Sequence, residues 1–234
     1  MPTPVDLLAE RVRHDGARPL LTQYRDGART ELSAASFANW ADKTVNWLDE
    51  EDLTDLDGTG ESLLAIELAL TEPAHWMTFV WWMAAWQAGL PVTPVPAAEA
   101  AVRVGGPTIT AGGAEFVIGC SLHPFAMPGP VAPGVLDFSD EVRPQPDVHQ
   151  AAPVDPERPA WLDRRGEVTV AGLLDDLTPT TGVGLLTTPT DAWTALRQGL
   201  LSPLLGGGSA VLVSGTVSDA ELATITRSEG IRSD

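Results

Sequence analysis

The sequence predicts a layered α/β protein, in which parallel strands and the helices that connect them alternate along the chain. The segment from Ser62 to Leu70 is an almost continuous apolar run, broken only by Glu67, as in strands that helices cover on both faces. The segment from Pro73 to Ala88 is apolar on nearly every side, which predicts a buried helix. A second apolar run from Leu90 to Val95 follows, and the three segments together form a βαβ unit.

The composition agrees with one large domain or two small lobes around a sizeable core, because the chain has 234 residues and 44% of them are hydrophobic. Lys and Arg number 14 against 32 Asp and Glu, and the net charge of −18 argues against nucleic-acid and peripheral-membrane partners. A single cysteine, Cys120, excludes an internal disulfide and multi-cysteine metal sites. No metal site is expected.

The N-terminus and the most apolar segment predict a cytoplasmic protein without a membrane span. Residues 1–8 contain no basic region followed by an apolar run, which a secretory signal would require. The stretch from Ala74 to Ala88 is shorter than the roughly 20 apolar residues that cross a bilayer. It also contains His75 and Gln87, so we expect a buried helix of a globular protein.

The N-terminal part predicts a helix, a hairpin and a second helix. Apolar residues at helical spacing predict the first helix over residues 4–14, and the apolar run 19–24 followed by Asp26-Gly27 predicts the hairpin. Ser33 can cap the second helix, which carries an apolar stripe and a polar face. The stripe comprises Phe37, Trp40, Ala41, Thr44, Val45 and Leu48, and the face expected toward solvent comprises Asn39, Asp42, Lys43 and Asn46.

The middle of the chain predicts short elements and then a long crossing segment. We expect a helix over residues 97–102 and two short extended segments at 108–110 and 115–119. Nine prolines lie from Pro124 to Pro159, and they disfavour both helix and central strand. We therefore expect an extended crossing between two α/β lobes, with residues 1–123 in the first lobe, 124–159 in the crossing segment and 160–234 in the second, partial lobe.

The C-terminal part predicts a hairpin and then alternating strands and helices. Residues 160–163 and 167–170 are expected to pair around the turn Arg164-Arg165-Gly166. Ser218 and Glu221 occupy the two positions of a capping box at the start of the last helix. The other expected elements are a strand at 183–187, a helix at 190–201, a strand at 209–214 and the last helix at 218–228.

Several segments resemble the N-terminal half of the AMP-dependent acyl-CoA synthetase and ligase (adenylate-forming) superfamily. The buried strand 63–70, the helix start Thr71-Glu72-Pro73-Ala74 and the turn Gln87-Ala88-Gly89-Leu90-Pro91 follow the family's pattern in order. The segments 185–189 and 200–213 are similar to the family's later strand, helix and strand. Within the superfamily, the chain resembles a short, uncharacterised group of homologues, which implies a truncated form of the family's fold.

The resemblance implies a phosphate-binding loop, which this chain lacks in its usual form. Members of the family hold ATP phosphates with a Ser/Thr/Gly-rich loop that ends in Pro-Lys-Gly, and its position falls near Asp163 to Thr169. Here that stretch contains one glycine, two acidic residues and the pair Arg164-Arg165. The chain's only lysine, Lys43, lies on the second helix, so the loop lysine and the family's C-terminal catalytic lysine have no counterpart.

Other family features are missing as well. Thr190-Asp191-Ala192 occupies the family's aromatic-His position, and the chain ends before the Tyr-Gly-x-Thr-Glu segment, the ribose-binding Asp and the small C-terminal domain. The resemblance therefore implies no catalytic residue in this chain. The cofactor is unknown from the residues themselves, and ATP or AMP is suggested by the resemblance alone.

Three further motifs have structural interpretations. Gly206 to Gly208 follow a helix and precede a strand, where glycine is expected as a helix end and a turn. Thr180-Thr181-Gly182 runs directly into an apolar strand and has no lysine beyond it. Cys120 and His123 lack the third, orienting group that an activated thiolate needs, so we interpret Cys120 as a strand-end residue.

The candidate site is the turn Arg164-Arg165-Gly166, at the position of the lost phosphate loop. The leading hypothesis is a catalytically degenerate, ligase-like protein that acts as a binding or regulatory module or as an incomplete subunit, with an unknown small-molecule ligand. In the alternative, the guanidinium groups replace lysine in an active ligase that binds a nucleotide or acyl substrate, or a partner chain completes the enzyme. A third hypothesis is a structural protein that pairs exposed strand edges in a homo-oligomer or with a partner protein. In the simplest interpretation, Arg164 and Arg165 bind no ligand and only offset the negative charges of Asp163 and Glu167.

Overall fold

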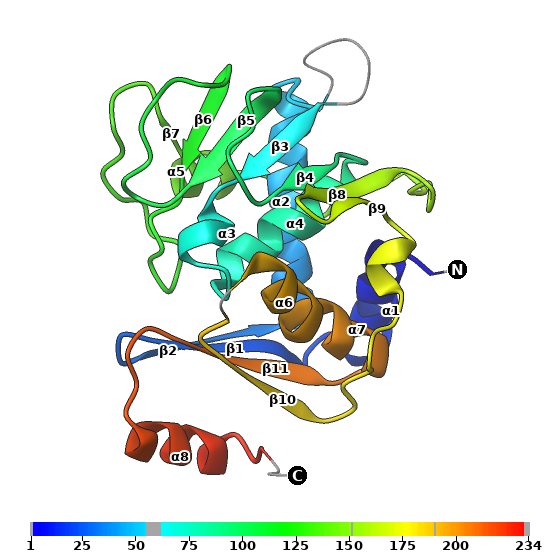
Figure 1. Ribbon diagram of the computed structural model, residues 1–234, viewed down its shortest axis with the longest axis vertical. Helices are drawn as coiled ribbons and strands as arrows, with labels where there is room; N and C mark the ends of the chain where they lie inside the picture. The colour runs from blue at the N-terminus through cyan, green and yellow to red at the C-terminus, as the bar shows by residue number, and fades with distance from the viewer. Residues whose placement is uncertain (1, 55–61, 151, 190, 232–234) are drawn as a thin grey trace.

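A computed structural model describes residues 2–54, 62–150, 152–189 and 191–231, which fold into two β-sheets and the helices around them (Figure 1). The strands are β1 (Pro19–Arg25), β2 (Ala28–Ser33), β3 (Leu63–Ile66), β4 (Val92–Thr93), β5 (Ala100–Gly105), β6 (Phe116–Gly119), β7 (Leu136–Asp137), β8 (Pro159–Asp163), β9 (Gly166–Thr169), β10 (Val183–Thr187) and β11 (Ser209–Ser214). The helices are α1 (Pro4–Asp15), α2 (Ala34–Glu50), α3 (Leu68–Thr71), α4 (Trp76–Gln87), α5 (Phe138–Val142), α6 (Ala192–Leu196), α7 (Ser202–Gly206) and α8 (Asp219–Ser228), with a 3₁₀ turn η1 (Gly172–Leu174) and a π-turn η2 (Arg197–Leu201).

The seven-stranded sheet has the order β7-β6-β5-β3-β4-β8-β9, and the four-stranded sheet has the order β10-β11-β1-β2. Neighbouring strands are parallel except in the two hairpins, β1–β2 and β8–β9. The predicted α/β fold class is therefore confirmed. Both sheets contain strands from before residue 124 and from after residue 158, so hydrogen-bonded pairing crosses the expected lobe boundary.

The N-terminal prediction of helix, hairpin and helix is confirmed. Thr3 and Asp6 form a capping box at the start of α1, and the Ser33 side chain accepts the Ser36 N–H at the start of α2. In the turn between β1 and β2, Asp26 and Gly27 have φ values of 49° and 78°. These left-handed conformations are what a two-residue hairpin turn requires, and they explain the Asp-Gly sequence.

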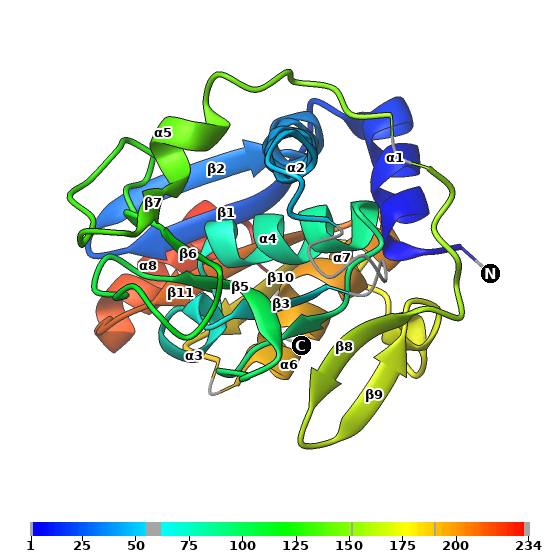
Figure 2. The same ribbon diagram turned by 90° about the horizontal axis from the view of Figure 1, so that it is seen from above.

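The polar face of α2 is only partly exposed, which corrects the prediction for this helix. Asn39 is exposed as predicted, whereas Asp42, Lys43 and Asn46 are partly buried. Residues 143–149, here called the strap, lie along it, and Figure 2 shows this part of the chain passing over α2 on its way to β8. Lys43 Nζ donates to the backbone carbonyls of Arg143 (3.1 Å) and Gln145, and Asn46 Nδ2 donates to those of Pro146 (3.0 Å) and Val148 (3.1 Å). Pro144 and Pro146 disfavour regular structure in the strap, so its carbonyls accept hydrogen bonds from helix side chains instead of from a strand or helix ladder.

The strand predicted over residues 62–70 ends at Ile66, because the chain turns into the short helix α3 at Leu68. Glu67 lies at this break and receives two hydrogen bonds from Arg103 of β5, at 2.5 and 2.9 Å. The charged pair lies at the carboxyl end of the sheet, where a continuing strand would bury Glu67. Apolar content alone therefore overestimated the length of the strand.

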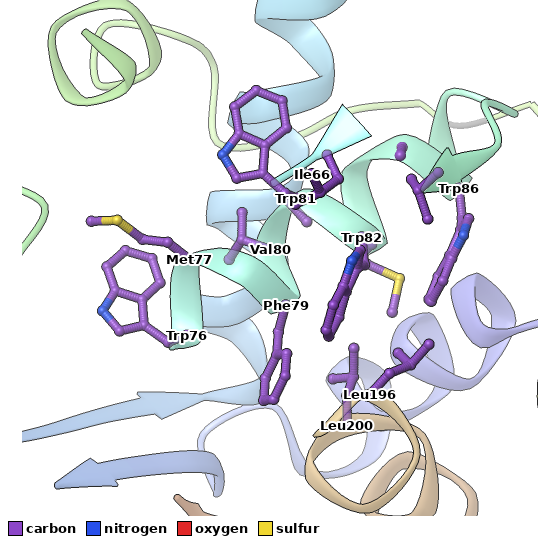
Figure 3. Packing of buried hydrophobic residues seen from close by; sticks show 14 of the residues in the cluster. Ile66, Trp76, Met77, Phe79, Val80, Trp81, Trp82, Trp86, Leu196 and Leu200 are labelled. Carbon is purple, nitrogen blue, oxygen red and sulfur yellow. The ribbon is translucent and has the colours of Figure 1, made fainter. Parts of the chain in front are cut away.

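Helix α4 forms the centre of the core. Every residue from Trp76 to Trp86 is buried, which confirms the prediction of an aromatic core helix. Figure 3 shows Trp81 beside Ile66 of β3 on one side of the helix, and Phe79 beside Leu200 of η2 on the other. The helix begins at Trp76 rather than at Pro73, because the His75 side chain caps it by accepting the Met77 N–H at 3.2 Å.

The segment predicted as a helix over residues 97–102 forms strand β5 instead. Ala100, Val102 and Val104 are buried, whereas the residues between them are partly exposed, which is the period of a strand. Pairing with β3 and β6 on either side outweighs the helix propensity of the Ala and Glu residues at its start. Of the two short segments expected next, only 115–119 forms a strand, β6, and residues 108–110 do not.

The proline-rich segment 124–159 is extended for most of its length but contains two short elements. Strand β7 and helix α5 occupy the proline-free interval between Pro133 and Pro144. The Asp137 side chain caps α5 by accepting the N–H groups of Ser139 and Asp140. The expectation that prolines exclude all regular structure from this stretch is therefore wrong over residues 136–142.

The C-terminal elements follow the prediction, with one change in the helix after β10. Strands β8, β9, β10 and β11 and the capping box of α8 are confirmed. The helix begins at Ala192, widens into a π-turn at 197–201 and ends at Gly206. Within the π-turn, a Cβ on Gly199 would lie 2.7 Å from Cζ of Phe79, so glycine permits the close approach of α4.

Among the described residues, no helix has both the length and the apolarity to cross a membrane.

Trp82→Ala should lower the free energy of unfolding by about 3 to 5 kcal/mol, because the ring is fully buried and its loss leaves a large cavity. The Trp82 ring stacks on Phe79 at 5.3 Å and meets Trp161 of β8 edge-on at 5.6 Å. Urea unfolding measures the change, and Trp82→Phe serves as the control that keeps part of the packing. An unchanged midpoint for Trp82→Ala would show that α4 is not the core helix.

Stability should fall from neutral toward acidic pH partly through His75. Burial, with a contribution from the nearby charge of Arg25, lowers the pKa of His75 to about 3. The unfolded chain takes up a proton near its ordinary pKa of 6.5, whereas the folded chain does not, so folding weakens as the pH falls.

In His75→Asn, which keeps a helix-capping acceptor, the loss of stability between about pH 7 and pH 5 should be smaller than in wild type by about 2 kcal/mol. Urea titrations of both proteins at each pH measure this difference. If both proteins lose the same stability over this pH range, His75 takes up its proton in the folded protein as readily as in the unfolded chain.

Candidate functional site

A pocket of about 300 Å³ lies at the carboxyl ends of β3, β4 and β8, next to the start of α6. The carboxyl edge of a parallel sheet is the usual place for a ligand in α/β proteins. We call this site the arginine pocket. It is lined by Ala69, Leu70, Pro94, Val95, Asp163, Arg164, Arg165, Asp191, Ala192 and Trp193.

The tight β8–β9 hairpin brings the predicted site residues to this edge. Asp163 pairs with Gly166 across the turn, and Gly166 has a φ of 106°, which a residue with a side chain rarely adopts. Trp86 of α4 donates from Nε1 to the Ala160 carbonyl at 3.0 Å and so ties β8 to the core helix. The turn Arg164-Arg165-Gly166 is exposed, as predicted, but it is held on a rigid base.

Arg165 is fixed by two carboxylates and one aromatic ring. Its guanidinium forms ion pairs with Asp163 and, at 3.3 Å, with Asp191 at the start of α6. It also lies over the Trp193 ring, 5.8 Å from the centroid, and Arg197 lies 5.4 Å from the same centroid. The partner expected from the sequence, Glu167, is not among these contacts. It pairs with Leu162 and therefore lies on the opposite face of the hairpin from Asp163.

Both carboxylates around Arg165 stay ionised at neutral pH. Partial burial acts to raise the pKa of Asp163, but hydrogen bonds from the backbone N–H and guanidinium of Arg165 outweigh it and hold the pKa below its ordinary value. Burial likewise acts to raise the pKa of Asp191. Hydrogen bonds from Thr194 and the charge of Arg165 lower it overall. The charge of Arg165 is therefore compensated within the protein.

Arg164 differs from its neighbour, because no ion pair or hydrogen bond of its guanidinium joins the residues that the structure describes. It lies beside an apolar rim formed by Leu70 and Val95, which are 55% and 40% exposed. An exposed cation next to exposed apolar side chains can bind a small anion that carries an apolar group. The two carboxylates in the lining, Asp163 and Asp191, disfavour a highly charged anion such as a triphosphate.

The other sequence motifs lie outside this pocket. Lys43 binds the strap and forms an ion pair with Asp147 at 2.9 Å. Gly207 ends α7 with a φ of 70°, which confirms the helix-end interpretation of the glycine run. Cys120 is fully buried at the end of β6, where burial raises the pKa of its thiol to about 12, so it is not a reactive thiolate. Across the described ranges, no cluster of His, Cys, Asp and Glu could hold a metal ion.

The residues that complete the pocket come from other elements and were not predicted from the sequence. Asp191 caps α6 by accepting the Thr194 N–H at 3.0 Å, and an Asp before an apolar helical segment is a recognisable capping signal. Leu70 and Val95 carried no signal, because exposure cannot be predicted from an apolar run. The place of Trp193 in the pocket depends on tertiary packing, because its ring lies against that of Trp161 of β8, with the centroids 5.4 Å apart.

No protein-family model matches the chain. A curated protein of Mycobacterium tuberculosis (strain ATCC 25618 / H37Rv), described as a "TIGR03089 family protein", is 34% identical over 238 aligned residues, which cover 92% of each chain.

Solved structures of adenylate-forming enzymes share the fold. The Brucella canis acyl-CoA synthetase matches with a TM-score of 0.73 and 15% identity, over 98% of this chain and 46% of its own. The anthranilate CoA ligase AuaEII, in complex with anthranoyl-AMP, gives a TM-score of 0.71 and 17% identity, over 96% and 48%. The fatty acyl-adenylate ligase of L. pneumophila, in complex with acyl adenylate and pyrophosphate, gives 0.61 and 14%, over 91% and 39%. The expected fold resemblance is confirmed, and the chain spans about half the length of these proteins or less.

Arg165→Ala should lower the free energy of unfolding by about 0.5 to 1 kcal/mol, because it removes two partly exposed ion pairs and a cation–π contact. Arg164→Ala should change stability by less than about 0.5 kcal/mol, since its side chain has no such partners. Urea unfolding of the two variants compares them directly. Equal effects of the two substitutions would mean that the ion pairs and the ring contact of Arg165 do not stabilise the fold.

Proposed function

The chain belongs to the TIGR03089 family, and from its fold and its arginine pocket we propose that it is a catalytically degenerate, ligase-like binding module that does not itself form adenylates. The observation that carries this proposal is the state of the two arginines at the position of the lost phosphate loop. Arg165 is compensated by Asp163 and Asp191, whereas Arg164, the other cation of the lining, has no ion-pair partner in the part of the chain that the structure describes.

The charge balance of the pocket argues against ATP as a ligand. Two guanidinium groups face two ionised carboxylates, so the pocket has little net positive charge to offer a triphosphate. The turn offers a single glycine, Gly166, in place of the run of backbone N–H groups that cradles phosphates in nucleotide-binding loops. Lys43, the only lysine, is bound to the strap.

The same pocket suits a small carboxylic acid with an apolar body. A carboxylate can accept two parallel hydrogen bonds from the Arg164 guanidinium, and Leu70, Val95 and Trp193 offer apolar surface for the remainder. A volume of about 300 Å³ limits the ligand to a small one. In this proposal, the fold retains acid binding while the activation step is lost.

One observation favours a second candidate function. The chain matches about half the length of full adenylate-forming enzymes, so a partner chain could supply the remainder and restore activity. The two functions differ in a simple test, because the module should bind an acid without ATP, whereas the completed enzyme should consume ATP only when the partner is present.

The purified chain should show no carboxylate-dependent exchange of pyrophosphate into ATP, because no lysine and no glycine-rich loop meets the phosphates. Exchange measured with a panel of aromatic and aliphatic acids tests this, with an active acyl-CoA ligase as positive control. Exchange above background with any acid by this chain alone would overturn the proposed loss of activity.

Binding should be detected as an increase in melting temperature with one or more small apolar acids, since a ligand that binds only the native state stabilises it. Replacing both Arg164 and Arg165 by Ala should weaken the affinity for such an acid by about tenfold or more, because charge-assisted hydrogen bonds contribute at least about 1.5 kcal/mol. Arg13→Ala, which removes an exposed arginine of α1 outside the pocket, is the matched control. If the double variant binds the acid as tightly as wild type, the two arginines form no binding site and the turn is only a solvated turn.

A further inference from the structure

The fold brings together two glycine-containing motifs that are far apart in sequence. Residues 180–182 lie directly on Gly206 and Gly208, because a Cβ on Gly206 or Gly208 would fall 2.3 Å from the Thr180 carbonyl oxygen. The Thr180 N–H donates to the Ser202 carbonyl, and the Ser209 N–H donates to the Gly182 carbonyl, both at 2.9 Å. These glycines are therefore required for the contact between the two segments.

A pocket of about 350 Å³ lies beside this contact, at the amino ends of β10 and β11 and away from the arginine pocket. We call it the glycine pocket. It shares no lining residue with the arginine pocket. Its lining includes Gly182 and Gly207 and three hydroxyl groups. Thr181 and Ser209 supply two of them, and Thr22 of β1, only 3% exposed, supplies the third.

Two arginines complete the glycine pocket. Arg11 of α1 is buried and donates from Nη1 to the Gly207 carbonyl at 2.5 Å and from Nη2 to the Gly208 carbonyl at 3.4 Å, so its guanidinium is fixed against the glycine run. Its Nε has no hydrogen-bond partner among the described residues. Arg18 is exposed, and among the described residues its ion pair is with Asp15, at 3.4 Å; the same Asp15 pairs with Arg11 at 3.5 Å. One buried and one exposed guanidinium thus share a single carboxylate.

The charge of the pocket is positive in a chain with a net charge of −18. Two cations face Asp15, which is only one anion. The other acidic residue in the lining, Glu229, is already paired with Arg29 at 2.9 Å and accepts a hydrogen bond from Tyr24 at 2.5 Å. A local excess of positive charge beside three hydroxyl groups has the chemistry of an oxyanion site.

We propose that the glycine pocket binds the phosphate group of a small phosphorylated molecule. Arg11 and Arg18 would bind the phosphate oxygens, and Thr181 and Ser209 would donate hydroxyl hydrogen bonds. A free phosphate ion fills only part of this pocket, and Val183 and Val211 add apolar surface to its lining, so the ligand carries an organic group besides the phosphate. This site is independent of the acid-binding function proposed for the arginine pocket.

Calorimetric titration with glycerol 3-phosphate and with inorganic phosphate, at constant ionic strength, tests the proposal. Glycerol 3-phosphate should bind in a saturable manner and more tightly than inorganic phosphate. Arg18→Ala should weaken its binding by about tenfold or more, as expected for a lost charge-assisted contact. Asp15→Asn should tighten binding severalfold, because it frees both guanidinium groups from their shared carboxylate.

Arg13→Ala is the matched control, because it removes an exposed arginine from α1, the helix that carries Arg11 and Asp15, without changing the lining of the pocket, and it should leave the affinity unchanged. Arg164→Ala should also leave phosphate binding unchanged, which separates this site from the arginine pocket. Arg18 is exposed, so its replacement should not prevent folding, and thermal unfolding of each variant checks this. Equal affinities of wild type, Arg18→Ala and Asp15→Asn, or no saturable binding of either phosphate, would overturn the proposal. Inorganic phosphate binding as tightly as glycerol 3-phosphate would overturn the assignment of an organic phosphate.

Discussion

The burial of α4 is the constraint on which the rest of the structure depends. A helix with large apolar side chains on every side must be covered in all directions, and here α2, β3, η2 and β8 each contribute to that cover. Trp81 meets Trp47 of α2, Phe79 reaches Gly199 of η2, and Trp86 binds the Ala160 carbonyl of β8. Elements from both ends of the chain are therefore needed to bury one helix, which explains why hydrogen-bonded strands cross the expected lobe boundary.

The same arrangement brings the carboxyl ends of parallel strands from both sheets to one side of the molecule. Arg25 at the end of β1 pairs with Glu72, just after α3, at 2.8 Å, and so links the four-stranded sheet to the carboxyl edge of the seven-stranded one. The arginine pocket lies on this edge, and its charges are arranged by the hairpin and by α6 together. In the function proposed above, this scaffold keeps a ligand pocket without the loop that supports catalysis, since the pocket depends on strand ends and the chemistry on the loop.

Most elements of the fold could be predicted, because each had a local physical cause. Ser33, Ser218 and Asp26-Gly27 act within a few residues of themselves, and capping and turn geometry need no tertiary information. The predictions failed where a distant partner decided the outcome. The pairing of β5 with β3 and β6 overrode a helix-forming sequence, and the Glu67–Arg103 pair marks the point where β3 ends.

By itself, the sequence determined the α/β class, the aromatic core helix, the resemblance to adenylate-forming enzymes and the position of the Arg164-Arg165 turn, because these follow from composition, periodicity and local motifs. Only the tertiary structure decided what those residues do. It compensates Arg165 with Asp191 from a different element, leaves Arg164 without a partner among the described residues, and covers Lys43 with the strap. It also places Gly206 to Gly208 beside residues 180–182 and Arg11. The physical reason is that charge compensation and pocket formation depend on distances between segments, and these distances are set only when the core is packed.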